Sequence, residues 1–328
     1  MSDVKVNNTG YPEGDPTLSP GVGPDASVAP GRDPVMQDPD PAPGGADEAR
    51  EAAGRISVRQ PNYMLWAGLT LVGALLLMML ISLVWTPHNP LATSSDFRMQ
   101  LQPPSARYPF GTDHLGRDVL SRAMIASQTV FLIGVSTLVI SGSIGITLGL
   151  IAGYKGGWVD IIIMRFIEVF STIPGTIQLL LFITIFGRGT TQTIIAISVM
   201  SFTSFARLVR SRVLSLRQQE HIMWAKVIGA SPLRIIVQHI MPDLIPLILV
   251  ISANQFSSAV MAEAGLSYLG LGVQPPQPSW GNMLTRAQAG LLTNPWNAII
   301  PGILITLLVV GFNLTADGLS RRYNIKER

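Results

Sequence analysis

The stretch from residue 63 to residue 85 reads YMLWAGLTLVGALLLMMLISLVW and holds no charged residue in 23 positions. A helix needs roughly 20 mostly apolar residues to cross a bilayer core about 30 Å thick. Tyr63, Trp66 and Trp85 lie near the ends of the stretch, where aromatic side chains favour the boundary between lipid and water. The stretch therefore predicts a membrane-spanning helix.

Five further stretches have the same uncharged, apolar character, and we expect each to cross the membrane once. Pro174 falls inside one of them and is expected to loosen its helix, because proline removes one backbone hydrogen bond. The sequence thus predicts an all-α membrane protein with six transmembrane helices. The five further spans are 123–154, 169–187, 189–206, 244–262 and 296–316.

The composition of the chain excludes several classes of protein. Of its 328 residues, 48% are hydrophobic and only 13% are charged, whereas soluble domains carry charge at about 25% of positions. The absence of cysteine excludes a disulfide scaffold and any cysteine-based metal or redox site. An ordinary soluble enzyme is therefore not expected.

The N-terminal region differs from the rest of the chain. Residues 1–60 hold half of the 20 acidic residues and nine of the 24 prolines. Such a composition cannot bury enough apolar surface to offset the entropy of ordering. We therefore expect a disordered cytoplasmic tail at 1–58, either simply solvated or used for regulation or docking, and a six-helix domain at 59–328.

The distribution of lysine and arginine predicts the orientation. With the N-terminus in the cytoplasm, 17 of the 23 basic residues lie on the inner side, in accordance with the positive-inside rule. Both termini are then cytoplasmic in a multi-pass protein of the plasma (inner) membrane. The long connections become one inner loop at 211–242 and two outer loops at 86–122 and 264–295.

The spans carry almost no chemistry of their own. Their middles hold essentially no ionisable group, and Arg165 and Glu168 are expected to form an ion pair near one span end. The chain has no phosphate-binding loop, no metal-ligand spacing among its four histidines and no nucleophile elbow. We expect no catalytic residue, no metal site, no cofactor held by this chain and no nucleic-acid partner.

Small and polar residues within the spans indicate helix contacts. Gly145, Gly149 and Gly153 follow Ser141 at four-residue spacing, which favours close helix packing. Five uncharged polar residues either bridge helices or line a hydrated translocation path, and the sequence slightly favours bridging. They are Thr172, Gln178, Asn254, Gln255 and Ser258.

The inner loop is the most informative segment. Residues 219–242 read QEHIMWAKVIGASPLRIIVQHIMP. We predict a short amphipathic helix at 219–228, a left-handed cap at Gly229 and a second helix with Ser231 as its N-cap and Pro232 as its first residue. The second helix should end at Pro242 and place four apolar residues on one face: Leu233, Ile236, Val237 and Ile240.

This loop resembles the EAA loop of ABC importer permeases. Aligned on Gly229, the name-giving triplet falls on Met223, Trp224 and Ala225, of which only Ala225 matches. The wider pattern of peptide permeases matches better, through Gly229-Ala230-Ser231 and the residues that follow. The resemblance implies a coupling helix that docks on an ATPase subunit, with nine contributing residues: Met223, Trp224, Ala225, Lys226, Gly229, Ala230, Ser231, Arg234 and Pro242.

Two predicted outer segments narrow the resemblance. Residues 110–122 read FGTDHLGRDVLSR and residues 263–284 read EAGLSYLGLGVQPPQPSWGNML. Both are similar to segments of the C-type permease of dipeptide, oligopeptide and nickel importers, which implies the type I ABC importer permease fold. Residues 274–279 form a stiff outer lid by this reading, and Trp280 should anchor at the membrane interface.

The first of these segments has two possible roles. It could tie the outer loop to a sister permease or a receptor, or it could form an internal turn stabilised by contacts between aspartate and arginine. The six residues concerned are Gly111, Thr112, Asp113, Gly116, Arg117 and Asp118.

The resemblance implies a permease subunit that moves dipeptides or oligopeptides into the cytoplasm. It also implies a second homologous permease, two ATP-binding subunits or one fused ATPase, an extracytoplasmic peptide-binding protein and surrounding lipid. ATP and Mg²⁺ would be bound by the partners. A nickel or metallophore importer is the alternative within this class, and a stand-alone secondary carrier is the alternative outside it.

Overall fold

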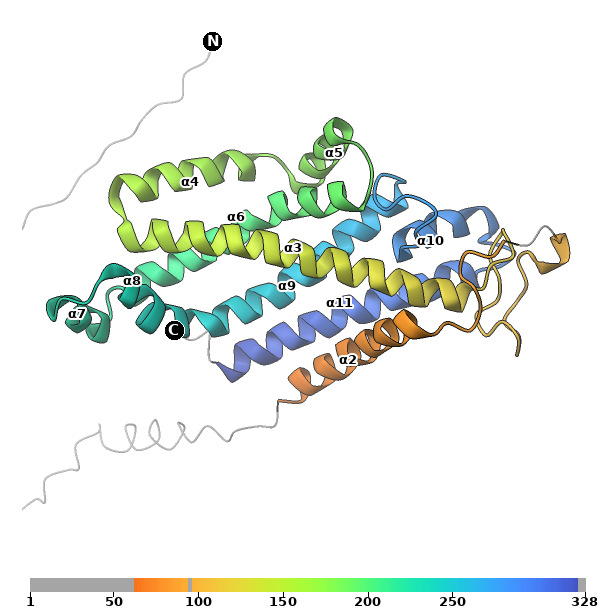
Figure 1. Cartoon of the computed structure of the whole chain (residues 1–328), viewed down its shortest axis with the longest axis horizontal. Helices are drawn as coiled ribbons and strands as arrows, with labels where there is room; N and C mark the ends of the chain where they lie inside the picture. The colour runs from red at the N-terminus through yellow and green to blue at the C-terminus, as the bar shows by residue number, and fades with distance from the viewer. Residues whose placement is uncertain (1–61, 94–95, 324–328) are drawn as a thin grey trace, which may run out of the picture. The chain divides into compact units, whose positions relative to one another are not determined.

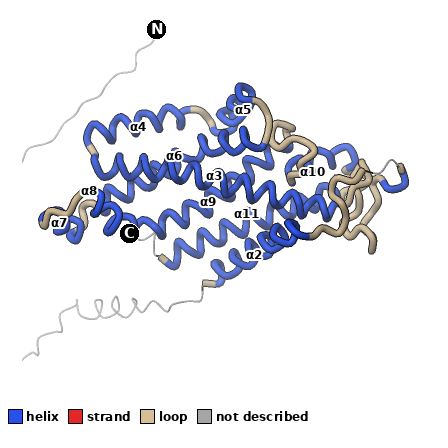
Figure 2. Tube along the Cα trace, in the orientation of Figure 1, coloured by secondary structure: helices blue, strands red, loops and turns tan. Residues whose placement is uncertain are grey.

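The computed structural model describes residues 62–93 and 96–323. The predicted tail at 1–58 lies outside these residues. The described part is built from helices, and its one β-bridge joins Thr112 to Asp118. Figure 2 shows that the longest irregular segments gather at one end of the helices.

Five helical segments are long and apolar enough to cross a membrane. One of them is continuous from Pro232 to Tyr268, because α8 (Pro232–Ile235) runs through a π-helical turn (Ile236–Ile240) into α9. Several helices extend past their predicted apolar stretches, since a helix can continue into water beyond the bilayer. The others are α2 (Tyr63–Val84), α3 (Val119–Lys155), α6 (Thr190–Leu216) and α11 (Trp296–Arg322), and α9 itself is Met241–Tyr268.

The predicted span at 169–187 is not one helix. It belongs to two helices, α4 (Gly157–Thr172) and α5 (Gly175–Phe186), which meet at an angle of 86°. Ile173 adopts an extended conformation, as residues before proline prefer, and Pro174 lacks the N–H that would continue the helix. The prediction that Pro174 only loosens its helix was therefore too weak, because the helix breaks completely at this residue.

The path of the chain shows that α4 and α5 together make one crossing. Asn62 donates to the carbonyl of Gly318 (2.5 Å), so the chain enters α2 and leaves α11 at the same end. This end also carries α7 (Glu220–Val227), and we call it the α7 end (Figure 1). The other end carries α10 (Trp280–Ala287), and we call it the α10 end. Because α3 delivers the chain to the α7 end and α6 leaves from the α10 end, α4 and α5 must connect the two. The six predicted crossings are thus confirmed.

The small residues of α3 allow α6 to approach closely. A Cβ atom at Gly145 would lie 2.5 Å from the carbonyl oxygen of Phe202, and one at Gly149 would lie 2.7 Å from that of Ala206. Figure 1 shows the two helices running alongside each other. The prediction of helix packing at these glycines is therefore confirmed.

A second core joins α3 to α9 and α11. The rings of Phe256 and Phe312 stack with centroids 4.0 Å apart, and Phe131 packs on Phe256 at 5.7 Å. Buried aliphatic residues surround this stack. This cluster is one of four buried hydrophobic clusters in the described part of the chain.

Ion pairs fix α4. Arg165 and Glu168 form the predicted pair, 3.0 Å apart and exposed. A second pair, which the sequence did not reveal, joins Asp160 on α4 to Arg210 on α6. The residues of this pair are fifty positions apart, so helical spacing could not predict it.

Candidate functional site

The segment between α6 and α9 forms a capped helical hairpin. The N–H of Gly229 donates to the carbonyl of Lys226 and that of Ala230 donates to Ala225, each at 3.0 Å. This pair of bonds is the Schellman motif, and it requires the left-handed φ of 81° found at Gly229. Ser231 accepts the N–H of Arg234 and so caps α8. Both predicted caps are confirmed.

One face of the hairpin is anchored in the bundle. Ile222 and Ala225 of α7 are buried, together with Ile235 and Ile240 of the following segment. They pack into one cluster with buried residues from α3, α6 and α9. Since this cluster includes side chains from three long helices, movement of the hairpin must displace those helices as well.

The opposite face of the hairpin is apolar and exposed. The exposed fraction is 66% for Trp224, 72% for Leu233 and 75% for Val227, and Met223 and Ile228 lie beside them. Exposed apolar patches of this kind mark interaction sites. The α7 surface, defined as Met223, Trp224, Val227, Ile228 and Leu233, is therefore a candidate docking site.

The second helix differs from its prediction in two ways. It does not end at Pro242, because the π-helical turn carries the chain directly into α9. Its four predicted apolar residues also do not share one face, since Leu233 and Val237 are exposed while Ile240 is buried. The π-helical turn changes the register of the side chains, which a regular helical period does not predict.

Polar contacts tie the hairpin to its neighbours. The ammonium group of Lys226 lies 5.6 Å from the ring centroid of Tyr154 at the end of α3. His221 lies 3.9 Å from Asp243 at the start of α9. Most of the nine residues singled out in the sequence are exposed, but Ala225 is buried and Ala230 is half-buried. Ala225 therefore anchors the hairpin rather than facing outward.

The segment at 111–118 folds as an internal turn at the α10 end. The Asp113 carboxylate accepts the N–H groups of Leu115 (2.8 Å) and Arg117 (3.0 Å). It also receives the guanidinium of Arg117 at 2.7 and 2.8 Å. Gly111 and Gly116 supply the positive φ angles at which the chain reverses.

Two further residues of this segment are used internally. The Thr112 hydroxyl donates to the carbonyl of Met99 (2.7 Å). Asp118 caps α3 and accepts the hydroxyl of Ser121 (2.6 Å) and an imidazole nitrogen of His88 (3.1 Å). The side chains of Thr112, Asp113, Arg117 and Asp118 are all buried. Contact of this turn with a receptor or sister subunit stays a prediction.

Burial and charge shift the acid–base behaviour of this turn. Burial alone would raise the pKa of Asp113, but the hydrogen bonds from Arg117 and Leu115 outweigh burial and hold the pKa below its ordinary 3.8. The pKa of His114 is lowered, first by burial and then by nearby arginines, against the attraction of Asp113. The turn thus keeps an ionised aspartate beside a neutral histidine at neutral pH.

Residues 145–325 match the family described as the binding-protein-dependent transport system inner membrane component. That span covers most of the described bundle, including the α7 hairpin. The chain belongs to this family. It is thus an ABC importer permease subunit and a multi-pass membrane protein, and the stand-alone carrier is set aside.

Relatives of this permease have names that refer to peptide transport. It is 39% identical over 235 residues to the dipeptide transport system permease protein DppC of Alkalihalophilus pseudofirmus, covering 70% of this chain and 77% of that protein. It is 38% identical over 216 residues to the glutathione transport system permease protein GsiD of Pectobacterium atrosepticum, covering 66% and 72%. Among solved structures, the inward-facing MetNI methionine ABC transporter in its native crystal form matches 61% of this chain and 92% of that chain, with 18% identity and a TM-score of 0.47.

The five polar residues named for a translocation path lie on three helices of the permease: α4, α5 and α9. Thr172 ends α4 and is exposed, and Gln178 is half-buried in α5. Asn254 and Ser258 lie one turn apart on an exposed strip of α9, with Gln255 half-buried beside them. The hydroxyls of Thr172 and Ser258 bond to carbonyls of their own helices. In the described part of the chain these residues therefore do not bridge helices through their side chains.

Several residues at the α10 end were missed or misread in the sequence. Trp280 is fully buried and its indole N–H donates to the carbonyl of Ala123 (3.0 Å), so its predicted role as an interfacial anchor is wrong. Asn294 and Asn297 donate to carbonyls of the loop before α3. Glu263 is buried at 1% exposure and accepts the hydroxyl of Ser267 (2.7 Å). The one signal for Glu263 in the sequence was its position at the start of the 263–284 segment.

Proposed function

We propose that this permease moves dipeptides or short oligopeptides into the cytoplasm, driven by ATP that partner subunits hydrolyse. The names of its relatives and the resemblance of its two α10-end segments to peptide-importer permeases support this substrate class. The chain itself would hold neither ATP nor Mg²⁺ and would carry no catalytic residue. Its task would be to convert movement of the ATPase into movement of the bundle.

The two-faced α7 hairpin carries the proposal. Its exposed apolar face suits docking into a groove on a partner, while its buried face is packed against α3, α6 and α9. A displacement of the docked partner would therefore be passed to helices that span the whole bundle. This is a rigid-body switch between packed states, with the driving contacts made in the partner.

The same proposal sets the orientation and the partners. The α7 end, where α2 begins and α11 ends, would face the cytoplasm, since most basic residues fall on that side. A second homologous permease would complete the translocation path, because Asn254 and Ser258 are exposed on α9 and open to a neighbouring subunit. A peptide-binding protein would dock at the α10 end, and one fused or two separate ATPase subunits at the α7 end.

Uptake of a labelled dipeptide by the reconstituted complex tests the proposal. The variant Gly229→Ala strains the cap, because φ is 81° and an alanine there costs about 1–2 kcal/mol. We expect the complex to assemble, but the amount of dipeptide taken up per ATP hydrolysed to fall several-fold. The matched control is Gly187→Ala, where φ is 88° and added side-chain atoms also meet open space.

Two outcomes would count against the proposal. If both variants take up the same amount of dipeptide per ATP hydrolysed, the hairpin does not couple ATP hydrolysis to transport. Calorimetry of the purified binding protein with peptides and with nickel complexes tests the substrate class, and binding of nickel complexes alone would replace peptide import by nickel import.

A further inference from the structure

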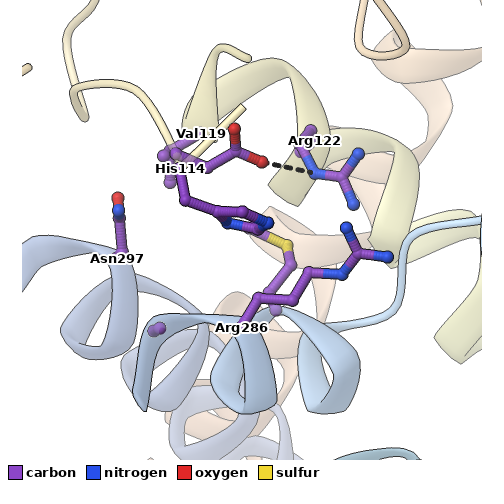
Figure 3. A pocket seen from close by; sticks show the side chains of 8 residues that line it. His114, Val119, Arg122, Arg286 and Asn297 are labelled. Carbon is purple, nitrogen blue, oxygen red and sulfur yellow. Dashed lines mark ion pairs between the residues drawn. The ribbon is translucent and has the colours of Figure 1, made fainter. Parts of the chain in front are cut away.

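A small hollow at the α10 end is lined by an excess of positive charge. It measures about 20 Å³ and lies among the turn at 111–118, the first turns of α3, α10 and the start of α11. Figure 3 shows His114, Arg122 and Arg286 directed into it from three different segments, with Asn297 on its far side. A volume of this size holds one water-sized group.

The charges around the hollow do not balance. Asp113 is the one carboxylate among the lining residues, and its closest contacts are with Arg117 at 2.7 and 2.8 Å. Arg122 reaches the same carboxylate only at 3.8 Å. Arg286 forms no ion pair with any residue of the described part of the chain. Because Arg117, which does not line the hollow, already pairs with Asp113, the two lining arginines Arg122 and Arg286 have no carboxylate of their own.

No other titratable group within the described ranges corrects this excess. The carboxylate of Asp118 does not line the hollow and is occupied by Ser121 and His88. His114 contributes no compensating charge, since an imidazole is either neutral or positive. The excess is therefore about two positive charges.

Burial makes this excess costly. Arg122 is only 2% exposed, and within the described part of the chain its guanidinium donates one long hydrogen bond, to the carbonyl of Pro90 (3.4 Å). The pKa of Arg286 lies below its ordinary value, first because of burial and then because of repulsion by Arg117. Buried positive charges that are close together need a counter-charge to be stable.

We propose that this hollow binds one small monovalent anion of the size of chloride, held between the guanidinium groups of Arg122 and Arg286. The anion would draw α10 and the first turns of α3 together and so stabilise the α10 end. Size favours a halide over a larger oxyanion, because the hollow admits one water-sized group. The site is separate from the α7 surface and does not depend on the transported substrate.

Thermal unfolding of the full-length chain in lipid nanodiscs tests the site. Sodium gluconate serves as the baseline, and chloride replaces gluconate at constant ionic strength. A ligand that binds only the folded state raises Tm, in a manner that depends on its concentration and dissociation constant. We expect Tm to rise with chloride in the natural protein, and the rise to be lost in the Arg286→Gln variant.

The matched control is Arg98→Gln, which removes an exposed arginine that lies in the loop before α3 and does not line the hollow. It should keep the full chloride-dependent rise. If Arg286→Gln does not fold, Arg286→Lys keeps the charge and should keep the rise. A structure determined in bromide should also show a bromide ion between Arg122 and Arg286.

A Tm that does not change with chloride in the natural protein would overturn the proposal. So would an equal rise in natural protein and Arg286→Gln, or a hollow that holds only water in bromide.

Discussion

Removal of the largest side chain of the α7 surface should weaken docking of the ATPase subunit. Trp224 is 66% exposed, so about two thirds of its ring remains available to a partner. A tryptophan buries about 200 Å² when fully covered, which leaves about 130 Å² for the interface. At about 25 cal/mol per Å², covering this area contributes about 3 kcal/mol.

The Trp224→Ala variant should lose most of this contribution, about 2–3 kcal/mol after the small share that alanine keeps. A tenfold change in Kd corresponds to about 1.4 kcal/mol, so affinity should fall about 30- to 140-fold. The stability of the permease should hardly change, because most of the ring has no partner within the chain. Binding of the labelled ATPase subunit to the permease in nanodiscs measures the effect.

The control for this experiment is Trp66→Ala. Trp66 has the same exposed fraction, 66%, but lies on the membrane-spanning helix α2. It should leave the affinity for the ATPase unchanged. A Trp224→Ala variant with natural affinity, or an equal loss in both variants, would refute the assignment of the docking surface.

Two further predictions concern the stability of the bundle. Gly149→Ala should lower the free energy of unfolding by about 1–3 kcal/mol, because the added methyl group meets α6 at 2.7 Å. The control Gly142→Ala, on the same helix, meets only ordinary contacts near 3.9 Å and should be neutral. Thermal unfolding separates the two, and equal values would contradict the packing. Asp113→Asn should cost about 3–5 kcal/mol, because Arg117 then stays buried without its partner. The folded pKa of Asp113 lies below 3.8, so the stabilisation by its carboxylate is complete above pH 3.8 and is lost as the pH falls further. Unfolding measured against pH should show this acid loss in the natural chain and in Asp317→Asn, the control at an exposed site. The loss should be absent in Asp113→Asn.

The fold followed from the sequence wherever the signal was local. Uncharged stretches located the six crossings, because a bilayer demands about 20 apolar residues in a row. The caps at Gly229 and Ser231 were predicted because their own residue types determine the backbone there. Family membership followed from ordered strings of residues at both ends of the bundle, and the family comparison confirmed it.

The errors arose where distant residues decide the outcome. Trp280 was expected at the membrane interface because tryptophan favours that position, but it fills a space closed by α3. The break at Pro174 is an exception, because it follows from the local preferences of Ile173 and Pro174, which were weighed too lightly. The hollow between Arg122 and Arg286 joins residues more than 160 positions apart, so no local pattern could reveal it.

The central claim is that the α7 hairpin contacts the ATPase, and site-directed cross-linking tests it most directly. The natural chain contains no cysteine, so Val227→Cys gives a single thiol at a position that is 75% exposed. Leu292→Cys gives the matched thiol in the connection between α10 and α11, 99% exposed. In the assembled complex, Val227→Cys should cross-link to the ATP-binding subunit and Leu292→Cys should not. Cross-linking of the ATP-binding subunit to Leu292→Cys alone, or to neither variant, would contradict the account.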